Sequence, residues 1–150
     1  MNLFHLLLLL AAANAWTEVE FRGTIFCPRL DFEYKLYLKE VDMISDQTLY
    51  EDPEYIVVRN GSQEYRAFGG CEDDGPEDKM FEFAMEIEHN CNLKREFEFL
   101  VIGYNEVPLK TSKVYFRGDY HLDQGDAATE NKTSMTTVDK DTNRLTCHIV

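Results

Sequence analysis

Residues 81–91 read Phe-Glu-Phe-Ala-Met-Glu-Ile-Glu-His-Asn-Cys, and this stretch decides the fold class. Phe81, Phe83, Met85 and Ile87 alternate with residues that are mostly acidic. Because successive side chains of a β-strand point to opposite faces of a sheet, a period of two predicts a strand with one buried and one exposed face. The stretch is therefore predicted to lie in an antiparallel sheet that covers a hydrophobic core.

The same period of two recurs on both sides of this stretch. The other predicted strands cover residues 19–27, 32–38, 55–59, 65–68, 97–102, 114–122 and 145–149. In the strand over 97–102 we expect Phe97, Phe99 and Val101 to face the core, although this strand is apolar on both sides. No segment is a convincing amphipathic helix. We therefore expect an all-β fold, an antiparallel β-sandwich of seven to eight strands.

Asn60-Gly61 stands between two of these predicted strands, 55–59 and 65–68. The Asn-Gly pair is a strong signal for a tight hairpin turn, because both residues tolerate positive φ. We predict a hairpin at this position, with a loop lengthened by residues 62–64.

The composition limits the class of protein. The chain has 150 residues, with 28 acidic and 15 basic side chains and a formal net charge of −13. This length favours a single domain. The excess of acid argues against nucleic acid as a partner, since phosphate binding needs clustered Lys and Arg. The 44% of hydrophobic residues is too high for an acidic disordered chain.

The first fifteen residues are predicted to be a signal peptide. Residues 3–13 are almost entirely Leu and Ala, and this run is shorter than the roughly 20 residues that span a bilayer. Ala13 and Ala15 occupy the small-residue positions of a cleavage site, so we expect cleavage before Trp16. The mature chain is then a secreted, extracellular domain of residues 16–150. No later segment is long and apolar enough to form a transmembrane helix.

Secretion would place the four cysteines in an oxidising compartment. They are Cys27, Cys71, Cys91 and Cys147. None stands in a Cys-x-x-Cys spacing, so a zinc or redox site is not expected. We predict two structural disulfides, and the sequence leaves all three pairings open.

Two polar segments interrupt the strand pattern. Residues 123–144 contain no aromatic side chain and are predicted to be a polar, mobile loop. A sequon in this loop begins at Asn131 and another begins at Asn60, so both asparagines are predicted glycosylation sites. The acidic segment 72–79 is interpreted as a solvated loop rather than a loose Ca²⁺ site. We expect no metal ion and no cofactor.

Five motifs follow one another in the order and spacing of a known secreted family. They are Gly-Thr-Ile-Phe-Cys-Pro (23–28), Leu-Tyr-Leu-Lys-Glu-Val-Asp (36–42), Asn-Gly (60–61) with Tyr-Arg-Ala-Phe-Gly (65–69), Glu-Ile-Glu-His-Asn-Cys (86–91) and Tyr-Phe-Arg-Gly-Asp-Tyr-His-Leu (115–122). With these motifs the chain resembles the nematode transthyretin-like family. The resemblance covers roughly residues 19–122 plus Cys147, and the His-Asn-Cys element at 89–91 is its most specific part.

The resemblance implies a transthyretin-like sandwich that is stabilised by disulfides. In the topology that it implies, Cys27 and Cys91 lie at one end of the sandwich, and Cys71 and Cys147 lie at the other. A bridge needs Cα atoms within about 7 Å, so the implied pairs are Cys27–Cys91 and Cys71–Cys147.

Residues that could perform catalysis are few. His89 could act as a ligand or a general base, but we interpret it as a packed histidine whose ring nitrogens bond loop backbone. Hydroxyisourate hydrolases share the implied fold and need a Tyr-Arg-Gly-Ser/Thr tail, whereas this chain ends in Thr-Cys-His-Ile-Val (146–150). We therefore do not expect an enzyme.

We expect a non-catalytic binding or adaptor module whose partner is an extracellular protein or a small apolar ligand. A carrier of a hydrophobic ligand or lipid is the alternative, and a hydroxyisourate-hydrolase-like enzyme is the third candidate. Phe26, Tyr37 and Tyr115 stand on faces predicted to be exposed, and they form the predicted partner surface because aromatic residues are enriched in interface hot spots. The sequence does not specify an oligomeric state.

Overall fold

The computed structural model describes residues 16–41, 46–71, 80–103, 106–123, 134–139 and 145–149. Within these residues the protein has thirteen β-strands and no α-helix, so the prediction of an all-β fold is confirmed. The strands are β1 (Thr17–Phe26), β2 (Phe32–Glu40), β3 (Gln47–Glu51), β4 (Ile56–Val58), β5 (Ser62–Cys71), β6 (Met80–Phe81), β7 (Phe83–His89), β8 (Glu98–Gly103), β9 (Val107–Pro108), β10 (Thr111–Arg117), β11 (Tyr120–His121), β12 (Ser134–Asp139) and β13 (Leu145–Ile149).

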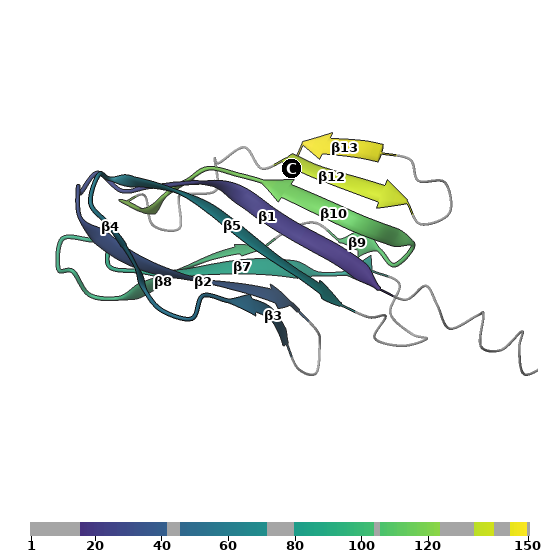
Figure 1. Ribbon diagram of the computed structural model, residues 1–150, viewed down its shortest axis with the longest axis horizontal. Coiled ribbons are helices and arrows are strands. Elements are labelled where there is room, and N and C mark those ends of the chain that lie inside the picture. Colours follow the sequence, from purple (N-terminus) through teal and green to yellow (C-terminus); the bar gives the residue numbers. More distant parts are fainter. Residues whose placement is uncertain are drawn as a thin grey trace, which may run out of the picture.

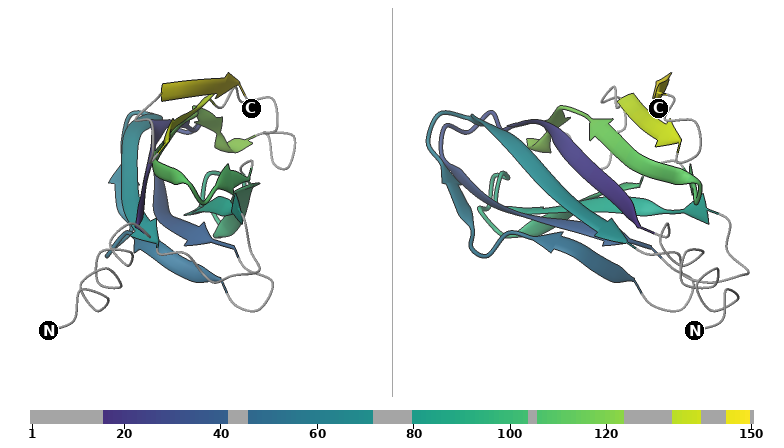
Figure 2. Two further views of the ribbon diagram at one scale, coloured as in Figure 1. Left: turned by 90° about the vertical axis from the view of Figure 1, so that its right-hand side faces the viewer. Right: turned by 45° about the vertical axis from the view of Figure 1, so that its right-hand side comes forward.

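Most strands belong to two sheets that lie face to face (Figure 1, Figure 2). In the first, which we call the β1 sheet, β1 lies between β5 on one side and β10 and β11 on the other, and β12 and β13 follow β10 outward. In the second, the β2 sheet, β2 pairs with β3 and β4 along one side and with β7 along the other. β8 pairs with β7 at the edge of this sheet.

The prediction of a purely antiparallel arrangement is wrong for part of the β1 sheet. β1 runs parallel to β10, with Glu18 opposite Lys113 and Arg22 opposite Arg117, and it also runs parallel to β11. Antiparallel strands can be joined by a two-residue turn, but parallel strands need a long connection. Here the chain passes through the whole β2 sheet between β1 and β10, so nothing local imposes an antiparallel pairing.

The facing sides of the two sheets supply one hydrophobic core. Phe21 of β1 stacks on Phe116 of β10, with 4.4 Å between the ring centroids. Phe83 of β7 meets the same Phe116 ring edge-on at 6.1 Å from the opposite sheet. All three side chains are at most 1% exposed. The alternation in residues 81–91 thus has the physical role that the sequence predicts, because its apolar side fills the space between the sheets.

Gly23 is required by a close approach of two strands. A Cβ atom at this position would lie 1.8 Å from the Gly118 carbonyl oxygen, which is far inside contact distance. The Gly118 N–H donates to the Arg22 carbonyl at 3.2 Å, and the Tyr65 hydroxyl donates to the Gly118 carbonyl at 2.9 Å. Any side chain at position 23 would therefore force β1 away from the segment between β10 and β11.

The Asn60-Gly61 turn connects the two sheets instead of closing a hairpin. β4 pairs with β2 and β5 pairs with β1, so the strands on either side of the turn lie in different sheets. Gly61 has a φ of 76°; its N–H donates to the Leu30 carbonyl at 3.0 Å, and its carbonyl accepts from the Cys27 N–H at 2.8 Å. The hairpin prediction is wrong because these groups bond the β1–β2 connection.

Three strands fall in segments for which the sequence predicts none. β3 precedes β4, β9 lies between β8 and β10, and β12 lies inside residues 123–144, which are predicted to be a loop. β12 pairs with both β10 and β13, and its Met135 is buried in the core. Neighbours on both sides supply its backbone hydrogen bonds, so a segment without an alternating apolar pattern forms a strand. Residues 124–133 and 140–144, like the predicted signal peptide 1–15, lie outside the described residues.

The strand predicted over residues 97–102 is present as β8 but faces the opposite way. Leu100 is buried, whereas Phe99 and Val101 are 57% and 59% exposed. The pairing of Ile87 with Leu100 sets this register. A shift of one residue exchanges the two faces of a strand, and a strand that is apolar on both sides gives no sequence signal for either choice.

Candidate functional site

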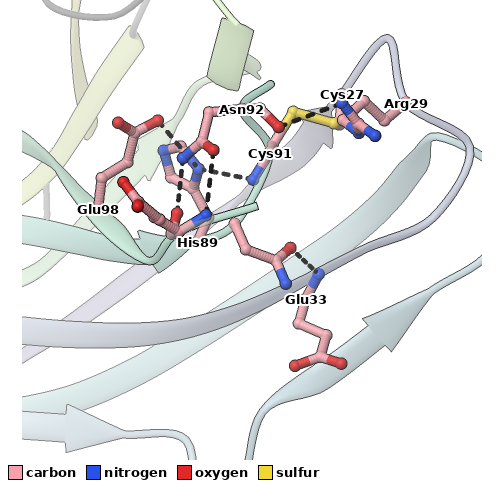
Figure 3. Close-up of polar contacts among 9 residues, drawn as sticks. Cys27, Arg29, Glu33, His89, Cys91, Asn92 and Glu98 are labelled. Atoms are coloured by element: carbon pink, nitrogen blue, oxygen red, sulfur yellow. Dashed lines mark hydrogen bonds and ion pairs between the residues drawn. A yellow bond between two sulfur atoms is a disulfide. The ribbon is translucent and has the colours of Figure 1, made fainter. Parts of the chain in front are cut away.

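The most specific sequence motif, His89-Asn90-Cys91, lies at one end of the sandwich, where β7 ends. Cys91 forms a disulfide with Cys27, which follows β1, and the two Cα atoms are 6.0 Å apart. The predicted Cys27–Cys91 pair is therefore confirmed. This bridge joins the β1 sheet to the β2 sheet. We call His89, Asn90, Asn92, Arg29 and the bridge the corner (Figure 3).

His89 is a buried structural side chain. It is 2% exposed, and its Nδ1 accepts a hydrogen bond from the Cys91 N–H at 3.2 Å. Burial lowers the pKa of His89, although the nearby Glu98 carboxylate opposes this shift. The Glu98 carboxylate lies 3.9 Å from Nδ1, too far for a hydrogen bond, and a neutral ring forms no ion pair with it. This geometry matches the packed histidine expected from the sequence.

The asparagines of the corner complete the backbone hydrogen bonding. The Asn90 side-chain carbonyl accepts from the Glu33 N–H at 2.8 Å, and the Asn90 N–H donates to the Glu33 carbonyl at 3.2 Å. Asn92 closes the following turn, because its amide donates to the Glu96 carbonyl at 2.6 Å and its side-chain oxygen accepts from the Glu96 N–H at 3.2 Å. Arg29 Nη1 donates to the Asn92 carbonyl at 3.2 Å.

The second implied disulfide, Cys71–Cys147, does not fit this order of strands. Cys71 is buried at the end of β5, on one side of β1. Cys147 belongs to β13, and β1, β10 and β12 lie between β13 and β5 (Figure 1). Neighbouring strands are about 4.8 Å apart, whereas a bridge needs Cα atoms within about 7 Å. The position of the Cys147 side chain is not described.

The predicted glycosylation sites differ in what the structure describes. Asn60 is exposed in the turn between β4 and β5, so its sequon is accessible. Asn131 lies outside the described residues, as does the acidic segment 72–79. In the described part of the chain, no group of three His, Cys, Asp or Glu side chains is close enough to hold a metal ion.

The predicted partner surface is divided between the two sheets. Phe26 and Tyr115 are half-buried on the outer side of the β1 sheet, and Phe26 stacks on His121 at 4.8 Å. Tyr37 is half-buried on the outer side of the β2 sheet. The three side chains therefore do not form one surface.

A larger group of exposed apolar side chains gathers around Tyr37. We call it the aromatic face, and its residues are Tyr37, Tyr55, Val57, Phe97, Phe99 and Val101. The Tyr55 ring packs at a tilt against Phe97, with 4.7 Å between ring centroids, and the Tyr37 ring lies 6.4 Å from that of Phe99. This face was not recognised from the sequence, because Phe97, Phe99 and Val101 were expected to point into the core. The double-sided apolarity of that strand was the one signal that could have revealed it.

A carboxylate lies among these rings. The Tyr37 hydroxyl donates to Glu88 at 2.9 Å. Burial raises the pKa of Tyr37, and the hydrogen bond to Glu88 raises it further. The same carboxylate raises the pKa of Tyr55. Both phenols therefore remain protonated at neutral pH, and Tyr37 donates to Glu88.

The lysines on this face are already paired with acids. Lys35 bonds Glu51 at 2.5 Å, and its ammonium also lies 5.2 Å from the Tyr37 ring centroid. Lys39 bonds Glu86 at 2.8 Å. Among the described residues, neither Glu33 nor Glu88 forms an ion pair, so the face combines aromatic rings with uncompensated negative charge.

Comparison with known proteins gives no match, either to a protein-family model or to a curated protein sequence. In the described part of the chain, no helix has the length and apolar character needed to cross a membrane. The function of the protein is therefore inferred from the geometry of the site.

Proposed function

We propose that this protein is a secreted, non-catalytic binding module of the transthyretin-like type, and that it binds an extracellular protein through the aromatic face. The observation that carries the proposal is the exposure of five apolar side chains on one side of one sheet. Tyr55, Val57, Phe97, Phe99 and Val101 are each at least 41% exposed. Contiguous exposed apolar patches with polar rims mark interaction sites, and aromatic residues are enriched among hot spots.

Two observations support the transthyretin-like class. The five sequence motifs keep the order and spacing of that family, and two facing sheets are joined by a Cys27–Cys91 bridge at one end. Secretion is supported by residues 1–15 and by the bridge, since disulfides persist in oxidising compartments. N-terminal sequencing of the extracellular protein tests this part: a start at Trp16 supports secretion, and a start at Met1 contradicts it.

The partner that fits the face presents Lys or Arg side chains. The whole chain carries a formal net charge of −13, and Glu33 and Glu88 add local negative charge on the face. A cation within about 6 Å of an aromatic ring centroid is attracted by roughly 0.5–1 kcal/mol at an exposed site. Lys35 shows such a contact within the chain. We therefore expect binding that weakens with salt, because exposed charges are screened.

The test is affinity capture from extracellular fluid with the mature protein as bait. The Phe97→Ser/Phe99→Ser variant should retain the partner at least about tenfold less than the wild type, because two hot-spot rings are lost. Phe68→Ser is the matched control, since Phe68 is 66% exposed on β5 of the other sheet. Equal retention by all three proteins would contradict the proposal.

A carrier of a small hydrophobic ligand is the second candidate. A hollow of about 550 Å³ lies beside the corner, and its lining includes Leu93, Phe97 and Leu122. Native mass spectrometry of the secreted protein separates the two functions. A bound small molecule that is lost in a Leu122→Ser variant would favour the carrier over the protein-binding module.

A further inference from the structure

Three arginines stand side by side on three neighbouring strands of the β1 sheet. Arg22 of β1 is the register partner of Arg66 on β5 and also of Arg117 on β10. β5, β1 and β10 are neighbours in Figure 1. All three arginines are exposed, and the residues adjacent to them in sequence (Phe21, Ala67 and Phe116) are buried. The three guanidinium groups therefore share the outer side of the sheet, and we call them the arginine row.

Three adjacent arginines lower the stability of the folded protein unless another group compensates their positive charge. Directly opposed residues on neighbouring strands have Cβ atoms about 5 Å apart, and like charges at that separation destabilise the sheet. The chain has only 15 basic residues against 28 acidic ones, yet three of the 15 meet here. Neighbouring acids compensate part of this charge, and the guanidinium groups that they leave unpaired could be compensated by an anionic ligand.

Only one member of the row is paired within the described residues. Arg66 forms a two-pronged ion pair with Glu20, with Nε–Oε1 at 3.0 Å and Nη2–Oε2 at 3.1 Å. Arg22 and Arg117 form no ion pair within 4.0 Å in this part of the chain. Glu20 therefore orients Arg66, while two guanidinium groups keep their donors available.

The surface over the row is hollowed. A depression of about 600 Å³ is lined by all three arginines and also by Thr24, Glu64 and Asp119. Asp119 is held by the sheet, because its Oδ1 accepts from the Thr24 N–H at 2.8 Å. The carboxylates of Glu64 and Asp119 thus lie beside the row, and they repel any ligand whose negative charge extends beyond the three arginines.

We propose that the arginine row is a binding site for a tetrahedral oxyanion, specifically the phosphate or sulfate group of a monoester. Guanidinium groups bind such oxygens through paired N–H donors in a fixed planar geometry. Arg22 and Arg117 supply free donors, and Arg66, whose charge is paired with Glu20, supplies a third guanidinium group beside them. The ligand is compact, because Glu64, Asp119 and the overall charge of −13 repel a long polyanion. The site lies on the sheet opposite to the aromatic face and does not depend on the protein-binding function.

The experiment is an NMR titration of the mature ¹⁵N-labelled protein with inorganic phosphate, sulfate and, separately, heparin as a polyanion. We expect saturable shifts confined to Arg22, Arg66, Arg117 and their strand neighbours. Arg117→Gln and Arg22→Gln should each weaken binding about tenfold, as expected for loss of one charge-assisted contact. Whichever of phosphate and sulfate binds more tightly identifies the group that the monoester carries.

Arg59→Gln is the matched control, because Arg59 is an exposed arginine in the turn between β4 and β5. It removes the same charge and should leave binding within twofold of the wild type. Arg22→Gln should also raise the thermal midpoint of the ligand-free protein, since it removes repulsion between opposed arginines. The proposal is overturned if Arg59→Gln weakens binding as much as the row variants do, or if the shifts do not saturate by about 50 mM phosphate. Tighter binding of heparin than of both small anions also overturns it.

Discussion

The corner and the aromatic face meet along β7 and β8, yet they are built in opposite ways. At the corner, His89, Asn90 and Asn92 use their side chains to bond backbone groups of this chain, and a disulfide closes the structure. On the aromatic face, Phe99 and Val101 remain more than half exposed to solvent. The most distinctive motif of the sequence, His89-Asn90-Cys91, therefore stabilises the fold. Apart from Tyr37, the residues of the aromatic face lie outside the five sequence motifs.

The largest effect on stability is expected from alanine substitutions at two glycines, of which Gly23 has no room for a Cβ atom and Gly103 has ample room. Gly23→Ala should cost more than about 4 kcal/mol of unfolding free energy, because the new Cβ would meet the Gly118 oxygen at 1.8 Å. Gly103→Ala on β8 is the control, since a Cβ there meets nothing within 4 Å, and its effect should stay within about 0.5 kcal/mol. Urea denaturation measures both, and equal stability of the two variants would contradict the contrast.

The next effect concerns the bridge itself. Cys27→Ala/Cys91→Ala should lose about 4 kcal/mol of unfolding free energy, because the bridge closes a loop with a sequence separation of 64. Partner capture at a temperature where the variant is folded should match that of the wild type. If the folded variant loses capture as completely as Phe97→Ser/Phe99→Ser, the corner and the aromatic face are one functional unit.

The smallest expected effect is a pH dependence of the unfolding free energy that is caused by His89 in the corner. Burial lowers the pKa of His89 below its ordinary 6.5, so the unfolded chain takes up the proton more readily than the folded one. The contribution of the neutral His89 ring to the unfolding free energy is fully present above pH 6.5. It is lost as the pH falls toward the pKa of His89 in the folded state. One proton contributes at most about 1.4 kcal/mol per pH unit. His89→Gln should flatten this part of the curve in denaturation measured from pH 8 to 5, and an unchanged slope would refute the assignment.

The buried side of the sandwich could be predicted from alternation alone. In β1, β2 and β7 one side is apolar and the other is polar, so only one orientation buries the apolar side chains. β8 could not be predicted in this way, because Phe99 and Leu100 are equally apolar and only pairing with β7 places Leu100 inside. The aromatic face was missed for the same reason. The Asn60-Gly61 turn was correctly located, but its hydrogen bonds go to residues 27–30, which local sequence does not reveal.

By itself, the amino-acid sequence determined the all-β class, the strands with one-sided alternation and the excess of negative charge. These follow from local periodicity and composition, which act over a few residues. Only the tertiary structure decided that β1 runs parallel to β10, that Arg22, Arg66 and Arg117 meet in one row, and which side of β8 is exposed. These features depend on which distant strands become neighbours, and that is decided by how all the apolar surfaces are buried together.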